Sequence, residues 1–281
     1  MQLVIVTGLS GSGKSIVMKA LEDSGYYCVD NLPAAMLGQV VQHLEAANHQ
    51  LAAVSIDTRS AELQDLPQHI EHVKSGHVEV RVLFLESSTE TLVKRYSETR
   101  RRHPLSNDIR TLAESIHAER EMLEELAGLG HRIDTSELSA NTLRSWVKDF
   151  IALDKSGLAL LVESFGFKHG IPLDADFVYD VRCLPNPHYD PKLRPLTGRD
   201  AAVVAFIQNQ PAALEMLADI QQYIEKWLPC FVRDNRSYLT VAIGCTGGQH
   251  RSVYFVEHLA AHFRALDQPV LVRHRELRET T

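Results

Sequence analysis

The chain has 281 residues, which is long for one domain and comfortable for two. Hydrophobic residues make up 44% and charged residues 23%, an ordinary globular composition that excludes a largely disordered chain, and no apolar run reaches the length of a membrane span. The formal net charge of −7 falls on residues 1–154, because basic and acidic residues balance in 155–281, so the neutral second part is the better candidate for binding nucleic acid.

A complete phosphate-binding motif follows the first predicted strand, the apolar residues 3–6. Residues 8–15 read G-L-S-G-S-G-K-S and match G-x-x-x-x-G-K-[ST]. In such a loop the backbone N–H groups surround the phosphates, the lysine reaches the β- and γ-phosphates and the serine hydroxyl binds Mg²⁺. Helical spacing after the loop completes the strand–loop–helix order, which predicts nucleoside triphosphate binding. The loop residues are Gly8, Leu9, Ser10, Gly11, Ser12, Gly13, Lys14 and Ser15.

Strand-like and helix-like segments alternate through the rest of residues 1–154. Strands are predicted near 26–29, 52–56, 80–85 and 132–135. Helices are predicted near 33–44, 66–74, 89–102, 108–127 and 138–153. This alternation predicts a parallel sheet covered by helices on both faces, the three-layer α/β fold of P-loop NTPases.

Two acidic residues stand where predicted strands end. Asp57 follows an apolar run, the pattern that holds Mg²⁺ beside a P-loop serine, so Ser15 and Asp57 are the predicted Mg²⁺ ligands. Asp30 could contact a substrate or a metal, as in small-molecule kinases of this fold, although either acid could simply form a turn. Arg59 lies at the same predicted edge and could contact a phosphate.

One dense basic cluster lies in the acidic first part, at Arg95 and residues 100–102. P-loop kinases carry arginines on a mobile lid that closes over the transferred phosphate. The alternative is a solvated helix end whose positive charge complements the helix dipole. The chain has no Asn-Lys-x-Asp string, so the sequence does not indicate which base is preferred.

Residues 155–281 are predicted to form a second, smaller α/β domain after a boundary at 155–157. Its predicted segments are a strand at 158–165, a proline-containing loop region at 166–195, helices near 201–209 and 212–228, a strand at 237–243, a helix at 253–265 and a strand at 270–273.

Residues 245–252 read C-T-G-G-Q-H-R-S between a predicted strand and a helix. This is the order found in cysteine phosphatases, where a thiolate attacks phosphorus, and loop N–H groups with Arg251 would bind an anion. Two features favour anion binding without catalysis: Gly244 stands where those enzymes usually carry histidine, and no loop with a general-acid aspartate can be assigned. A phosphatase and a structural turn remain the alternatives.

The four cysteines lie far apart and form no C-x-x-C pair, so we expect reduced thiols and a cytoplasmic protein without membrane association. A proline-stiffened loop at 184–195 presents His188, which could line a phosphate pocket although loop histidines are usually plain surface. Possible neighbours in that pocket are Lys168, His169, Arg194 and His250.

The C-terminal tail is a cationic segment that could bind a phosphate backbone, or it could simply be a solvated terminus. Its basic residues are Arg273, His274, Arg275 and Arg278.

Long strings of the sequence resemble the RapZ family of RNase adapter proteins and its nucleotide-binding relatives over nearly the whole chain. The strings are GLSGSGKS at 8–15, YYCVDNLP at 26–33, VSIDTRS at 54–60, RYSETRRRHPLS at 95–106, ESFGFKHGIPLDADFVYDVR at 163–182, LPNPHYDPKLRPLTG at 184–198 and RSYLTVAIGCTGGQHRSV at 236–253. The strings of the second domain make the resemblance specific, because a P-loop alone indicates only an NTPase.

The resemblance implies a cytoplasmic homotetramer whose N-terminal domain binds ATP or GTP with Mg²⁺ and hydrolyses it feebly. It also implies a C-terminal domain that binds small regulatory RNA, presents it to an endoribonuclease and senses glucosamine-6-phosphate, so that amino-sugar synthesis is controlled. The residues it assigns to the metabolite pocket are His188, Thr246, Gly247, His250 and Arg251. Those it assigns to a second nucleotide-contacting stretch are Asp57, Thr58, Arg59 and Ser60.

The C-terminal end departs from the family pattern. RNA-binding members end in a cluster of lysines and arginines, whereas here Glu276 and Glu279 interrupt the basic residues and the final lysines are missing. Fewer phosphate contacts weaken RNA binding and flatten its salt dependence.

Two enzyme classes are the alternatives to a regulatory adapter. A phosphatase would use Cys245 and Arg251. A small-molecule kinase would use Lys14, Ser15, Asp30, Asp57 and the lid at 100–102.

Overall fold

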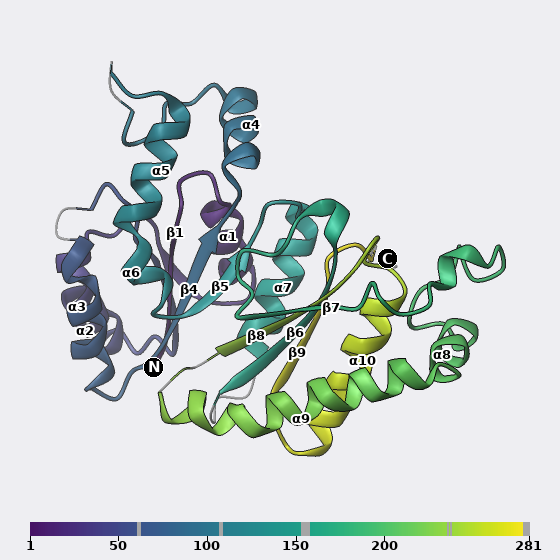
Figure 1. The fold of residues 1–281 in the computed structure, drawn as a ribbon. Helices are drawn as coiled ribbons and strands as arrows, with labels where there is room; N and C mark the ends of the chain where they lie inside the picture. The colour runs from purple at the N-terminus through teal and green to yellow at the C-terminus, as the bar shows by residue number, and fades with distance from the viewer. Residues whose placement is uncertain (61–62, 107–108, 153–157, 235, 237, 278–281) are drawn as a thin grey trace. The chain divides into compact units, whose positions relative to one another are not determined.

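The computed structural model describes all residues except 61–62, 107–108, 153–157, 235, 237 and 278–281 (Figure 1). The chain divides into two compact units, Met1–Ile151 and Ala152–Thr281, and each has a sheet of its own. The predicted boundary between residues 154 and 155 falls in a stretch outside the described residues.

A five-stranded parallel sheet forms the centre of the first unit, with the spatial order β2-β3-β1-β4-β5. Its strands are β1 (Gln2–Gly8), β2 (Tyr27–Val29), β3 (Leu51–Ser55), β4 (Glu79–Glu86) and β5 (His131–Asp134). Every residue of β1 is buried, because this central strand has helices on both of its faces. The predicted three-layer parallel sheet is confirmed.

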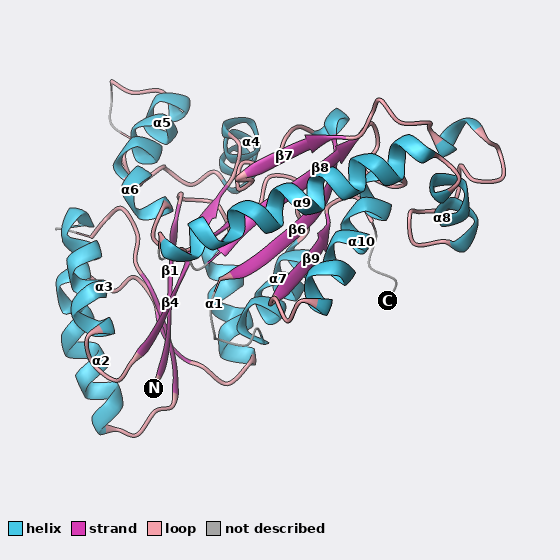
Figure 2. Ribbon diagram, turned by 60° about the horizontal axis from the view of Figure 1, so that its bottom comes forward, coloured by secondary structure: helices cyan, strands magenta, loops and turns pink. Residues whose placement is uncertain are grey.

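Helices cover both faces of this sheet, and Figure 2 shows α2 and α3 on one side of it with α1 on the other. The helices are α1 (Lys14–Asp23), α2 (Leu37–Ala46), α3 (Leu66–Lys74), α4 (Thr89–Thr99), α5 (Leu112–Met122), α6 (Glu124–Ala127) and α7 (Ala140–Ala152). Two short 3₁₀ turns, η1 (Ala34–Met36) and η2 (Leu63–Asp65), precede α2 and α3. Leu3 and Ile5 of β1 share one apolar core with the buried faces of α2 and α3.

Two predicted helices of the first unit end earlier or begin later than the sequence pattern indicates. The helix predicted at 89–102 ends at Thr99, because Arg100 adopts a left-handed conformation with φ of 52°. The helix predicted at 108–127 begins after Thr111, whose side chain forms a capping box with Glu114, and it is interrupted at Leu123.

The second unit contains a four-stranded parallel sheet with the spatial order β7-β8-β6-β9. Its strands are β6 (Ala159–Gly166), β7 (Phe177–Asp180), β8 (Tyr238–Cys245) and β9 (Val270–His274). Its helices are α8 (Ala201–Gln208), α9 (Pro211–Arg233) and α10 (Arg251–Ala265), with 3₁₀ turns η3 (Phe167–His169) and η4 (Pro187–Tyr189). The predicted second α/β unit is confirmed.

The strand β7 lies in the region that the sequence predicts to be loop. It has only four residues and forms an edge of the sheet, where alternate residues are exposed, so its apolar signal is weak. The strand β8 runs two residues further than predicted and brings Cys245 to the carboxyl edge of the sheet. All four cysteines carry free thiols, as predicted. Among the described residues no helix is both long and apolar enough to cross a membrane.

Candidate functional site

The P-loop of the first unit begins where β1 ends beside β4. A side chain at Gly8 would place its Cβ 2.0 Å from the carbonyl oxygen of Leu85, and φ at Gly8 is +129°, so only glycine fits here. The backbone N–H of Leu9 donates to the same carbonyl at 2.9 Å. The loop then turns into α1 at Lys14, which confirms the strand–loop–helix order.

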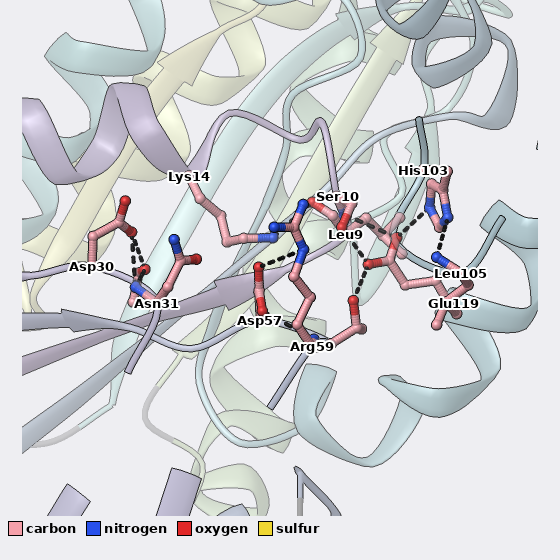
Figure 3. Close-up of polar contacts among 12 residues, drawn as sticks. Leu9, Ser10, Lys14, Asp30, Asn31, Asp57, Arg59, His103, Leu105 and Glu119 are labelled. Atoms are coloured by element: carbon pink, nitrogen blue, oxygen red, sulfur yellow. Dashed lines mark hydrogen bonds and ion pairs between the residues drawn. The ribbon is translucent and has the colours of Figure 1, made fainter. Parts of the chain in front are cut away.

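Lys14 is held inside this loop, as Figure 3 shows. Its Nζ donates to the carbonyl oxygens of Gly8 at 2.6 Å and Leu9 at 3.2 Å. Burial lowers the pKa of Lys14, while the charges of Glu119, Asp57 and Asp30 act to raise it. An ammonium group in this position can exchange carbonyl oxygens for phosphate oxygens, as the motif requires.

The two predicted acids follow β2 and β3, which are neighbouring strands. Asp57 accepts the backbone N–H of Arg59 at 3.0 Å, and the Arg59 Nε lies 3.9 Å from its other carboxylate oxygen. Asp30 accepts hydrogen bonds from the hydroxyl of Ser55 and from the backbone N–H of Asn31. Both carboxylates therefore lie at the edge of the sheet that carries the P-loop.

The Ser15 hydroxyl and the Asp57 carboxylate are oxygen donors of the kind that Mg²⁺ prefers. Within the described ranges, no three His, Cys, Asp or Glu side chains gather as a metal site. A magnesium ion here would therefore be held by Ser15, Asp57, the nucleotide phosphates and water, which is how P-loop proteins hold it. The donor chemistry of this edge fits that group.

Glu119, which no sequence motif marks, is a fully buried residue of α5 that joins three segments of the first unit. Its carboxylate accepts the backbone N–H and hydroxyl of Ser10 at 2.9 and 2.7 Å and the hydroxyl of Thr58 at 2.7 Å. It also faces Nε2 of His103 at 3.0 Å. Because Nδ1 of His103 accepts the N–H of Leu105, the ring proton is on Nε2 and points to Glu119.

Burial acts to raise the pKa of Glu119, but hydrogen bonds from His103, Ser10 and Thr58 outweigh it and hold that pKa below its ordinary value. The carboxylate is therefore ionised and fully used as a structural group. The signal that could have found it is helical spacing, since Glu119 lies on the buried face of α5 with Ser115 and Ile116.

The predicted lid arginines have two different environments. Arg95 donates to the carbonyl oxygen of Gly11 at 3.0 Å and to that of Thr135 at 2.6 Å, so it braces the P-loop from α4. Residues 100–102 are exposed beyond the end of α4. Their role as a lid stays a prediction.

Ser60, the last residue of the predicted nucleotide-contacting stretch, accepts the N–H of Ala34 at 2.7 Å.

In the second unit, residues 245–252, here called the anion loop, connect β8 to α10. The Sγ of Cys245 is buried, accepts the N–H of Gly248 at 3.2 Å and lies 3.2 Å from the hydroxyl of Ser252. The thiol therefore supports the loop from beneath. A Cβ at Gly244 would lie 2.5 Å from the rings of Phe165 and Phe167, which explains why this chain has no histidine there.

The residues of the predicted metabolite pocket lie close together around the anion loop. Arg251 is buried; its Nη1 donates to the carbonyl oxygens of Arg182 at 2.9 Å and Leu184 at 2.7 Å, and its Nη2 lies 3.4 Å from the Thr246 hydroxyl. Its buried Nε has no hydrogen-bond partner among the described residues. Gly247 lies beside Lys168, whose Nζ is 4.0 Å from where a Cβ would be.

Two histidines complete this cluster. The rings of His188 and His250 are 6.1 Å apart, and Nε2 of His250 lies 3.2 Å from the carbonyl oxygen of Leu193. Burial lowers the pKa of His250, so the ring is neutral near pH 7. Arg194 fixes the other histidine by donating to the His188 carbonyl at 3.1 Å, whereas His169 is exposed on η3.

The basic tail is largely inside the second unit. Arg273 has 2% of its surface exposed, and His274 lies 2.7 Å from the Ser164 hydroxyl and 3.1 Å from Glu257. The Arg275 side chain is 6% exposed, and its Nη1 lies 3.9 Å from the Glu163 carboxylate. Arg278 is outside the described residues. RNA contact at these positions stays a prediction, which the burial of Arg273 and Arg275 disfavours.

The sequence matches known families in both units. Residues 1–155 match the RapZ-like N-terminal domain, and residues 158–278 match the RapZ C-terminal domain. A nucleotide-binding protein of Methylobacillus flagellatus is 67% identical over 277 residues, which are 99% of each chain. Another of Thiobacillus denitrificans is 61% identical over 278 residues, 99% of this chain and 100% of that protein.

Among solved structures, shikimate kinase from Acinetobacter baumannii in complex with shikimate matches part of this chain. It has 16% sequence identity and a TM-score of 0.39, and the match covers 53% of this chain and 92% of that one. The two family matches and the whole-length relatives are much stronger. The chain belongs to the RapZ-like family of nucleotide-binding proteins.

Proposed function

We propose that this protein is a regulatory binding protein with one ligand site in each unit. The P-loop takes ATP or GTP with Mg²⁺, and the anion loop takes a phosphorylated sugar such as glucosamine-6-phosphate. The observation that carries the proposal is the buried Arg251, whose Nε is unpartnered within the described part of the chain. A buried guanidinium that still has a free N–H donor binds the anionic oxygens of a phosphate more strongly than it binds a neutral ligand group.

Several neighbours of Arg251 support a phosphate rather than a cation or an apolar ligand. The anion loop leads into the N-terminus of α10, where backbone N–H groups favour negative charge. Lys168 adds a positive charge beside Gly247, and the neutral His250 can donate or accept a hydrogen bond to a sugar hydroxyl. Cys245 is engaged beneath the loop, so binding is a better assignment for it than nucleophilic attack.

Titration calorimetry on the full chain tests both sites. We expect Lys14→Ala to weaken ATP and GTP binding by roughly 10- to 100-fold, the worth of one charge-assisted phosphate contact. Arg251→Lys keeps the charge but loses the planar fork, so glucosamine-6-phosphate should bind on the order of tenfold more weakly. Glucosamine without phosphate is the control ligand, and equal affinity for both sugars would overturn the second site.

Family membership also supports macromolecular partners: small regulatory RNA, an endoribonuclease and further copies of this chain in a homotetramer. Binding of total small RNA across a salt series tests the first of them. Contacts with a phosphate backbone should weaken steeply as salt rises. No saturable binding at moderate salt would remove RNA from the proposal. Sedimentation of the purified chain tests the tetramer.

The second candidate is a small-molecule kinase, and the position of Asp30 favours it. This carboxylate lies near enough to Lys14 to act on the pKa of its ammonium group, and it is held by Ser55 and Asn31. An acid in that place can accept the proton of an acceptor hydroxyl. Acceptor-dependent ADP release that is lost in Asp30→Asn, with nucleotide affinity unchanged, would establish a kinase. Slow hydrolysis that no acceptor accelerates would exclude one.

A further inference from the structure

The segment after β9 lies beside the anion loop. The strand β9 pairs with β6, and the N–H of Arg275 donates to the carbonyl oxygen of Ser164 at 3.1 Å. On its other side β6 pairs with β8, so that Gly166 lies opposite Cys245. Residue 276 therefore emerges at the carboxyl edge of the sheet, beside the anion loop. Ligands bind at this edge in parallel α/β sheets.

The side chain at this place is Glu276, and its carboxylate lies against Gly248 in the middle of the anion loop. A Cβ at Gly248 would be 2.2 Å from Oε2 of Glu276 and 2.8 Å from the backbone nitrogen of Gly166. The contact is possible because residue 248 is a glycine with φ of +71°. Oε2 is buried and has no hydrogen-bond partner among the described residues.

A carboxylate in this position is unfavourable for the ligand that the loop suits. The anion loop gathers N–H groups and cations that attract negative charge, and Glu276 brings negative charge to the same place. Two like charges within a few ångströms repel each other more strongly in a partly buried site than in water. An arriving phosphate therefore has to meet a neutral Glu276 or displace its side chain.

We propose that Glu276 is a carboxylate gate on the anion loop, which weakens phosphate binding while it is ionised and releases the loop when it is neutral or moved away. The inference rests on the proposed function of the anion loop. The occupant of the loop would be the phosphate group of a sugar phosphate, and the gate belongs to the chain's own C-terminal segment.

The surroundings of Glu276 make its charge variable near neutral pH. Burial raises the pKa of this carboxyl to about 7, although the N–H of Gly166 and the charges of Arg275 and Lys168 act to lower it. Lys168 faces it from η3 and Arg275 from its own segment. Above pH 7 the gate is mostly charged and binding should be weaker; below pH 7 it is mostly neutral and binding should be tighter.

The test is the affinity of the full chain for glucosamine-6-phosphate at pH 8, in the wild type and in Glu276→Gln. Glutamine keeps the shape and removes the charge, so the variant should bind on the order of tenfold more tightly. Glu215→Gln removes the same charge from an exposed position on α9 and should leave the affinity unchanged. At pH 6 Glu276 is mostly neutral, so the affinities of the wild type and Glu276→Gln should become equal. Titration of the ligand and of the histidines changes both affinities alike and does not affect this comparison.

The outcomes separate the gate from the site. Equal, measurable affinity of the wild type and Glu276→Gln at pH 8 overturns the gate and leaves the anion loop as a phosphate site. Weaker binding by Glu276→Gln makes the carboxylate a ligand contact and also overturns the gate. Folded proteins that all fail to bind, Glu276→Gln included, overturn the proposed function and the gate together.

Discussion

Each of the two loops has a carboxylate close to it, and the two carboxylates have opposite environments. Glu119 touches the P-loop with both oxygens occupied by donors from Ser10, Thr58 and His103. Glu276 touches the anion loop with one buried oxygen that has no hydrogen-bond partner among the described residues. Burial acts to raise the pKa of both carboxyls, but hydrogen bonds hold the pKa of Glu119 below its ordinary value, whereas the pKa of Glu276 rises to about 7.

This contrast separates structure from regulation. A buried carboxylate whose hydrogen bonds are complete stabilises the fold and cannot easily change its charge. A buried carboxylate that lacks some of its hydrogen bonds destabilises the fold while it is ionised, and its raised pKa lets its charge change within the physiological range of pH. In this protein the first kind fixes the shape of the nucleotide loop, and the second kind stands where a ligand would arrive.

The largest effect is expected from Glu119→Ala, which removes the carboxylate that holds the P-loop. The change leaves donors of Ser10, Thr58 and His103 buried without an acceptor, so the free energy of unfolding should fall by roughly 3–5 kcal/mol. Urea unfolding measures this. Glu114→Ala, which removes the exposed partner of Thr111 in the capping box of the same helix, should cost clearly less. Equal losses for the two variants would contradict a central role for Glu119.

Glu276→Gln should have a smaller effect and the opposite sign. The folded-state pKa of Glu276 is about 7 against an ordinary value of 4.5, so the proton is held more tightly in the folded protein. The contribution of Glu276 to stability is therefore most favourable below pH 4.5 and is lost as the pH rises through 7. At pH 8 the variant should be more stable than the wild type by about 1–2 kcal/mol. The difference should disappear near pH 4.5, and unfolding at both values checks it.

Short-range features of this protein were predictable from its sequence, and long-range ones were not. The P-loop depends on eight consecutive residues, so the motif and its context suffice. Glu119 is invisible to such a motif because its partners Ser10 and Thr58 lie 109 and 61 residues away. Glu276 reaches the anion loop only through the pairing of β9 with β6, and its sequence neighbours indicate merely an acid in a basic tail.

The tail also shows why a count of charges does not locate a surface. Arg273, His274 and Arg275 read as a cationic end, but the sequence does not reveal that β9 pairs with β6 at an edge of the sheet and packs against α10. The side chains of His274 and Arg275 lie close to acids from other segments, Glu257 and Glu163. Pairing across the sheet, rather than local composition, decided which cations remained exposed.

The smallest effect is expected from Glu257→Gln, which removes a carboxylate that contacts His274 of β9. Hydrogen bonding from His274, against the opposing effect of burial and with help from Arg199, lowers the pKa of Glu257 to about 2. Its stabilisation is therefore present above pH 4.5 and is lost as the pH falls toward 2, on the opposite limb of the pH profile from Glu276. The Glu257 side chain is 31% exposed and that of Arg199 is 56% exposed, so screening by water should keep this stabilisation below about 1 kcal/mol. Unfolding of Glu257→Gln between pH 2 and 6 should thus show a slightly flatter acid limb. The prediction is wrong if the free energy of unfolding of Glu257→Gln follows that of the wild type below pH 4.5 and departs from it only above pH 4.5. In that case Glu257 and Glu276 would act through one common rearrangement of β9 rather than separately.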